Sequence, residues 1–200
     1  MTLEFIIATL IAYLFGSISS AIIVCKLMGL PDPRTLGSKN PGATNVLRIG
    51  GKKAAIITLF GDMLKGVIPV LLAKLLAVSD LTLAGVTFAA FIGHLYPIFF
   101  RFEGGKGVAT ALGCLLALSF PAGLCWVGTW FVIAVIFRYS SLSSLTASLL
   151  APLYTWYFTN SYMFAVTIAI MSVILIIRHR SNIVKLISGN ESKLGQRKTL

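Results

Sequence analysis

Long apolar segments separated by short polar breaks occupy most of this chain, and they restrict what it can fold into. Hydrophobic residues make up 57% of the 200 residues and charged residues only 12%, whereas a soluble domain has about 25% charged residues. The apolar segments predict an all-α integral membrane protein with about seven transmembrane helices, because one span needs about 20 mainly apolar residues. We expect these helices over residues 3–27, 54–78, 82–100, 108–120, 122–137, 145–158 and 162–177.

Basic residues orient the predicted spans. Four polar segments separate or follow them, at residues 28–53, 101–107, 138–144 and 178–200. Together with Lys26 at the edge of the first segment, they contain every Lys and Arg except Lys65 and Lys74. Because cytoplasmic loops carry the excess of positive charge, we expect a single polytopic domain, residues 1–200, with the N-terminus outside (periplasmic) and the C-terminus cytoplasmic.

The segment 37–48 is the first candidate binding site. Its glycines, proline and asparagines suit tight turns, which let backbone N–H groups converge. Short polar side chains lie among them, and Arg48 adds positive charge. A concave set of such donors is typical of a phosphate or carboxylate site. An ordinary cytoplasmic loop, basic only because such loops usually are, is the alternative.

Gly104-Gly-Lys-Gly107 is the second candidate, since it precedes a predicted helix. Backbone N–H groups at a helix start, next to Lys106, form a typical anion site. The pattern is not a Walker A loop, because Phe100 stands where the first glycine belongs and Gly107 replaces the Ser or Thr. Alone the pattern is a weak signal, and its position on the same membrane face as segment 37–48 strengthens it.

Ionisable residues inside the spans allow two interpretations each. Asp62 and Lys65 are spaced i, i+3, so they either pair with each other or orient the neighbouring site. His94 either bonds helix to helix or supports the site, and His179, flanked by arginines, is better placed to bind an anion. Two histidines, and cysteines that do not pair by spacing, predict neither a metal site nor a disulfide framework.

The motifs resemble those of the bacterial acyl-phosphate:glycerol-3-phosphate acyltransferase family (PlsY). The resemblance lies in Gly-Ser-Ile at 16–18, in segment 37–48, in the stretch 93–110 and in Arg-His-Arg-Ser-Asn-Ile at 178–183, and it extends over nearly the whole chain. Two departures are visible: Lys39 stands where the family usually has glycine, and Ser19 where it often has proline. Neither change removes an expected phosphate ligand.

The resemblance implies a specific reaction. The enzyme would move a fatty acyl group from acyl phosphate to the 1-hydroxyl of sn-glycerol 3-phosphate, giving 1-acyl-glycerol 3-phosphate (lysophosphatidic acid) and phosphate in phospholipid biosynthesis. It would work without a cofactor at the bacterial cytoplasmic (inner) membrane. Its partners would be its substrates, membrane lipid, the upstream acyl-phosphate synthase and the downstream lysophosphatidate acyltransferase. The net charge of +11 does not indicate nucleic acid, since the basic residues lie in short loops.

The predicted catalysis uses no dedicated base. Neither histidine has an aspartate five residues later, because Phe99 and Val184 stand there. We expect substrate-assisted catalysis, in which Ser38, Arg48, Lys106 and His179 position two anions. The four polar segments would form the active site. The expected substrate- and phosphate-binding residues are Ser38, Asn40, Thr44, Asn45, Arg48, Gly104, Gly105, Lys106, Gly107, Ser141, Ser144, His179 and Asn182.

Three alternatives stay open. A transporter of anions or lipid phosphates predicts polar residues at the membrane midplane and paired broken helices, whereas polar residues here crowd one face. A structural membrane subunit would leave the polar loops without a purpose. Acyl-CoA or acyl carrier protein could serve as the donor, although the chain has no large soluble docking surface.

Overall fold

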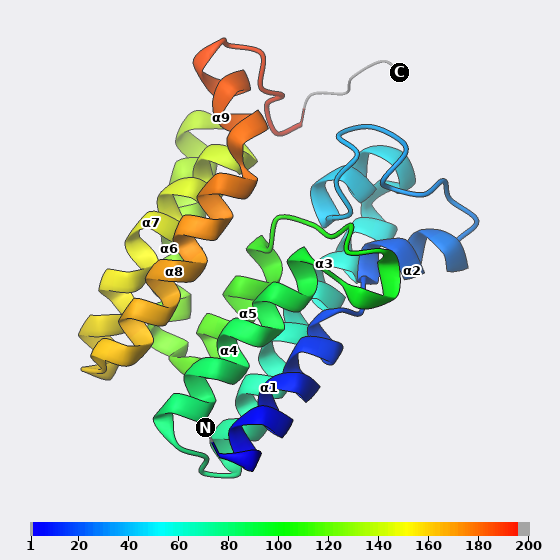
Figure 1. Ribbon diagram of the computed structural model, residues 1–200. Coiled ribbons are helices and arrows are strands. Elements are labelled where there is room, and N and C mark those ends of the chain that lie inside the picture. Colours follow the sequence, from blue (N-terminus) through cyan, green and yellow to red (C-terminus); the bar gives the residue numbers. More distant parts are fainter. Residues whose placement is uncertain (1, 196–200) are drawn as a thin grey trace. The chain divides into compact units, whose positions relative to one another are not determined.

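The computed structural model describes residues 2–195 and contains helices but no strand in that range (Figure 1). The predicted all-α class is therefore confirmed for the described residues. The end of the predicted tail, with Arg197 and Lys198, lies outside them. The helices are α1 Leu3–Gly16, α2 Ser20–Leu27, α3 Ala43–Leu75, α4 Asp80–Leu95, the 3-10 turn η1 Ile98–Phe100, α5 Val108–Leu118, α6 Phe120–Phe137, α7 Ser140–Thr159, α8 Tyr162–Arg178 and α9 Arg180–Ile187.

The chain divides into two compact units, Met1–Leu118 and Ser119–Leu200. In the first unit α3 packs against α1, α2, α4 and α5. In the second unit α7 packs against α6 and α8, and α9 follows α8 after a bend of 60°. Most of the predicted phosphate-binding residues belong to the first unit.

Four stretches of the described residues are long and apolar enough to cross a membrane. The bent pair of α8 and α9 would be a fifth, and α5 is a shorter apolar helix. The predicted spans therefore all correspond to helices, while the number that cross the membrane stays a prediction. The four stretches are Leu3–Leu27, Ala43–Leu75, Asp80–Phe100 and Phe120–Phe137.

The first span is broken where the sequence places small polar residues. α1 ends at Gly16 and α2 begins at Ser20, so a carbonyl group within the break, such as that of Ile18, has no helical N–H partner. Lys65 of α3 donates from Nζ to the carbonyl oxygen of Ile18 at 2.8 Å. A buried lysine thus satisfies a carbonyl that the break leaves without a helical partner.

Three helix boundaries differ from the sequence prediction. α3 begins at Ala43, inside the segment predicted as the loop 28–53, and is interrupted only at Gly51. α7 begins at Ser140, so most of the predicted break 138–144 is helical. The turn predicted near Pro121 lies at Ser119, and Pro121 occupies the first turn of α6, where the missing N–H of proline costs no hydrogen bond.

Glycines bring α3 and α5 into close contact. A Cβ atom on Gly66 would collide with the carbonyl oxygen of Thr110, and one on Gly113 would collide with that of Met63. Thr110 in turn donates from Oγ1 to the carbonyl oxygen of Asp62 at 2.9 Å. Small residues at both positions therefore fix α5, and the Gly-rich loop that precedes it, against α3.

Candidate functional site

Asn45 shapes the first candidate loop from inside. Its side chain is 1% exposed in the first turn of α3. Oδ1 accepts a hydrogen bond from the backbone N–H of Ser38 at 2.9 Å. Nδ2 donates to the carbonyl oxygens of Pro33 at 2.8 Å and Leu36 at 3.0 Å. The amide thus folds the loop back over the start of α3, and its predicted role as a phosphate ligand stays a prediction.

Asn45→Asp is expected to destabilise this loop. The carboxylate would keep the acceptor for Ser38 but would face two carbonyl oxygens without a donor. Leaving buried acceptors unsatisfied costs about 1–3 kcal/mol. Limited proteolysis of the loop, together with thermal unfolding in detergent, measures the change. Asn190→Asp, at an exposed asparagine, is the matched control, and equal behaviour of the two variants would contradict this role of Asn45.

The start of α3 carries exposed donors. Gly42 is the N-cap and no side chain caps the helix, so its first N–H groups point away from the helix body. Thr44 and Arg48 are exposed and lie one turn apart, and Ser38 is exposed in the preceding loop. A helix N-terminus attracts anions. Lys39 has φ +55°, the left-handed region that favours glycine.

The Gly-Gly-Lys-Gly loop presses against the end of α4. The backbone N–H of Gly105 donates to the carbonyl oxygen of His94 at 3.2 Å. A Cβ atom on Gly105 would collide with Nε2 of His94 and would lie 3.0 Å from the carbonyl oxygen of Pro41. Gly104 is packed against carbonyl oxygens of α4 in the same way. The two candidate loops therefore touch, and only glycine fits at their contact.

Lys106 and Gly107 complete this loop. Gly107 has φ +88°, which places the backbone in a region that side chains rarely adopt. α5 begins at the next residue, Val108. Lys106 is half-buried, between the buried Gly105 and Gly107. A lysine within a glycine loop therefore stands directly before a helix, and the anion site expected there stays a prediction.

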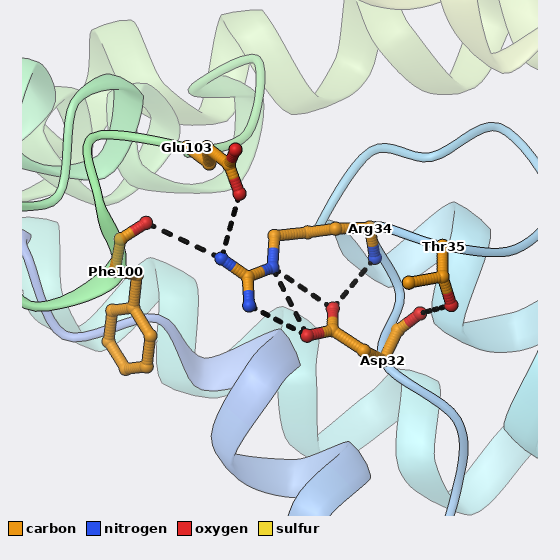
Figure 2. Close-up of polar contacts among 5 residues, drawn as sticks. All are labelled: Asp32, Arg34, Thr35, Phe100 and Glu103. Atoms are coloured by element: carbon orange, nitrogen blue, oxygen red, sulfur yellow. Dashed lines mark hydrogen bonds and ion pairs between the residues drawn. The ribbon is translucent and has the colours of Figure 1, made fainter.

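Arg34, which was expected only to help orient the spans as one of the basic loop residues, connects the two loops (Figure 2). Arg34 forms an ion pair with Asp32 at 2.7 Å and with Glu103 at 2.9 Å. Hydrogen bonds from Arg34 lower the pKa of Asp32 below its usual 3.8, because they favour the charged carboxylate. No spacing pattern predicts this contact, because Arg34 and Glu103 are 69 residues apart.

A buried ion pair stands beneath the Gly-rich loop. Lys65 Nζ lies 3.0 Å from Asp62 Oδ1, and both side chains are under 5% exposed. His94 Nδ1 lies 3.7 Å from the same oxygen. The predicted pairing of Asp62 with Lys65 is confirmed. The pair also reaches the break in the first span through Ile18 and approaches His94, on which Gly105 rests.

In the second unit, Glu191 joins two predicted site residues. Its Oε1 accepts hydrogen bonds from Ser141 Oγ at 2.6 Å and from Asn182 Nδ2 at 2.7 Å. We assigned Glu191 no role, although a lone acidic residue in a basic tail is the kind of signal that could have identified it. Ser144 instead donates to the carbonyl oxygen of Ser140 and accepts from Trp130 Nε1 at 3.1 Å.

His179 is held in one orientation. The ring is 3% exposed, and Nδ1 lies 2.8 Å from the carbonyl oxygen of Leu175. Because a carbonyl oxygen only accepts, Nδ1 carries the hydrogen, and Nε2 is the acceptor in the neutral ring. The first unit thus brings together the residues predicted at 38–48 and 104–107, and the second unit brings together Ser141 and Asn182.

Comparison with known proteins supports one family. The family model for glycerol-3-phosphate acyltransferase matches residues 6–189. A glycerol-3-phosphate acyltransferase of Methylococcus capsulatus is 57% identical over 187 residues, which are 94% of either chain. One of Burkholderia multivorans is 55% identical over 198 residues, covering 98% of this chain and 93% of the other.

Solved structures agree. The crystal structure of PlsY (YgiH), an integral membrane glycerol 3-phosphate acyltransferase, in its glycerol 3-phosphate form has a TM-score of 0.91 and 40% identity, covering 96% of each chain. Its lysophosphatidic acid form has a TM-score of 0.88 and 38% identity, covering 96% of this chain and 95% of the other. The chain therefore belongs to the glycerol-3-phosphate acyltransferase family and is an integral membrane acyltransferase.

Proposed function

We propose that this enzyme transfers a fatty acyl group from acyl phosphate to the 1-hydroxyl of sn-glycerol 3-phosphate. The observation that carries the proposal is the pair of loops that touch at Gly105, each directly before a helix N-terminus. Both substrates carry phosphate, and helix N-termini bind phosphate through N–H groups and the helix dipole. The related PlsY has been crystallised with glycerol 3-phosphate and with lysophosphatidic acid, which supports this acceptor and product.

The reaction needs positioning more than a strong base. The 1-hydroxyl oxygen attacks the acyl carbonyl carbon, the bond from that carbon to the phosphate oxygen breaks, and the hydroxyl proton passes to the departing phosphate. Cations and N–H groups hold the two anions together and stabilise the charge that develops on the carbonyl. The proposed ligands are Ser38, Asn40, Thr44, Asn45, Arg48, Gly104, Gly105, Lys106, Gly107, Ser141, Ser144, His179 and Asn182.

The proposed topology follows the charges. With seven spans, the N-terminus is periplasmic and the C-terminus cytoplasmic, since the basic segments 28–53, 101–107, 138–144 and 178–200 stay inside. The enzyme is then a single domain of the bacterial inner membrane, and apolar helix faces hold the acyl chain. Its metabolic neighbours are the synthase that supplies acyl phosphate and the acyltransferase that consumes lysophosphatidate.

The identity of the acyl donor tests the proposed function. Purified enzyme is expected to form lysophosphatidic acid with acyl phosphate, and not with acyl-CoA or acyl carrier protein, when each donor is supplied with labelled glycerol 3-phosphate. Thin-layer separation of the labelled lipid measures the product. Transfer from acyl-CoA alone would overturn the donor assignment. Uptake of glycerol 3-phosphate into proteoliposomes without a donor would favour a transporter instead.

A further inference from the structure

We infer that Arg34 is a positioning residue that holds the two phosphate loops together, an inference that rests on the proposed function. We name its contacts with Asp32, Phe100 and Glu103 the arginine clamp (Figure 2). Asp32 and Arg34 belong to the loop that leads to Ser38. Phe100 and Glu103 lead into the Gly-rich loop that carries Lys106.

The guanidinium group of the clamp divides its hydrogen bonds between the loops. Nη2 and Nε donate to the carboxylate of Asp32, at 2.7 Å to Oδ2 and 3.1 Å to Oδ1. Nη1 donates to Glu103 Oε2 at 2.9 Å and lies 3.4 Å from the carbonyl oxygen of Phe100. The planar fork of arginine fits such paired acceptors, and the compact charge of lysine does not.

Hydrogen bonds within its own loop also hold Asp32 in place, independently of the guanidinium group. Its Oδ1 accepts the backbone N–H of Arg34 at 2.9 Å, and its carbonyl oxygen accepts the Thr35 hydroxyl at 2.9 Å. Such aspartate turns restrict the local backbone. Arg34 is therefore held by its own loop. Its contact with Glu103 restricts the position of the second loop relative to the first.

Two contacts now join the same two loops. The clamp is one, and the packing of Gly105 against Pro41 is the other. A single contact would let the loops rotate about it, whereas two separate contacts fix their relative orientation. Misplacement of a binding group by about 1 Å can cost a large factor in rate, so the clamp acts on the separation between Ser38 and Lys106.

Direct binding of substrate by Arg34 is the competing role, and charge argues against it. Two carboxylates already neutralise the guanidinium group. The two roles predict opposite results when the charge of Glu103 is removed. If Arg34 attracted phosphate, Glu103→Gln would release Arg34 and strengthen the binding of glycerol 3-phosphate. If Arg34 clamps the loops, the same change weakens that binding.

The test compares Glu103→Gln, Arg34→Gln, Arg34→Lys and the double glutamine variant. Partly exposed ion pairs contribute little each, so we expect the KM for glycerol 3-phosphate to rise about threefold in Glu103→Gln. Because Arg34 also loses its bidentate pair with Asp32, we expect a rise of about tenfold in Arg34→Gln and in Arg34→Lys. The kcat should fall as well, but by a smaller factor than the KM rises, because the clamp touches no reacting atom and acts only through the separation between Ser38 and Lys106.

Coupling between the two residues gives a readout that is independent of catalysis. Thermal unfolding of wild type, the two single glutamine variants and the double glutamine variant yields a double-mutant cycle, in which the double variant should be no less stable than Arg34→Gln. Glu103 is the most exposed partner, with 63% of its side chain accessible, so Glu103→Gln should fold normally. Arg101→Gln, at an exposed neighbour, is the matched control.

Each outcome decides between the roles. Tighter or unchanged binding of glycerol 3-phosphate by Glu103→Gln overturns the clamp, and so does full rescue of the KM by Arg34→Lys. Additive losses of stability also overturn it. A wild-type enzyme that transfers nothing from acyl phosphate defeats the proposed function instead, while the coupling in thermal unfolding still reports whether the clamp exists.

Discussion

Lys106→Ala is expected to lower kcat/KM for acyl transfer by about 10²–10³, the usual cost of removing one donor that stabilises developing charge. Lys106 is half-buried in a loop whose neighbouring glycines pack closely against α4 and Pro41. No other Lys or Arg lies in the sequence between Arg101 and Arg138. The measurement is initial rate against both substrates with purified enzyme in detergent or lipid.

Controls separate this loss from a general loss of charge. Lys52→Ala removes an exposed lysine from α3 and should leave the rate within about twofold, because exposed charges act weakly through solvent. Arg48→Ala and His179→Ala should show losses of the same order as Lys106→Ala. If all three variants keep near-normal transfer from acyl phosphate, the assignment of the phosphate site is wrong.

Lys65→Ala is expected to cost about 3–5 kcal/mol of stability, because it leaves a buried carboxylate without its partner. Asp62 is 2% exposed and lies 3.0 Å from the ammonium group. The same change also removes the donor to the Ile18 carbonyl oxygen at the break in the first span. Thermal unfolding in detergent, followed by light scattering and tryptophan fluorescence, measures the loss.

Two further variants test whether the unpaired charge of Asp62 causes the loss of stability. Lys74→Ala removes a lysine from the same helix that is exposed and donates to Leu118 at 3.1 Å, so its effect should be small. The double variant Asp62→Leu, Lys65→Met replaces both charges with apolar groups of similar volume, which is often neutral for a buried pair. A double variant as unstable as Lys65→Ala would show that the Ile18 contact, rather than the unpaired charge, dominates.

The lengths of the apolar segments predicted the helices well, whereas the positions of polar residues predicted the helix ends poorly. Ala43–Gly50 was predicted as part of a loop because of Thr44, Asn45 and Arg48, yet it forms the first turns of α3, where Asn45 satisfies the loop backbone from within the helix. The serines from 140 to 144 are also helical, and Ser144 donates to the carbonyl oxygen one turn earlier. A membrane helix can therefore begin with polar residues when their side chains bond to the backbone.

The composition of the candidate site could also be anticipated only in part. Both loops carry small polar residues, and the pattern correctly indicated that the Gly-rich loop directly precedes a helix, whereas the helix start at Ala43 was not expected inside the segment 28–53. The sequence pattern could not distinguish polar side chains that are exposed to a ligand from polar side chains that hydrogen-bond within the loop. Asn45 and Ser38 look alike in sequence, but one side chain is buried and the other residue is exposed. Arg34 and Glu103 are too distant in sequence for any spacing rule to join them.

The close packing of α3 and α5 affects how the enzyme tolerates different membranes. Gly66 and Gly113 leave no room for α5 to slide, and Lys74 bonds to its last carbonyl groups. The Gly-rich loop directly precedes α5, while the non-helical Gly51 separates the first turns of α3 from the part of that helix that packs against α5. Helices tilt to match bilayers of different thickness. When this packed pair tilts, the Gly-rich loop moves with α5, and its contact at Gly105 with Pro41 carries that movement to the other candidate loop.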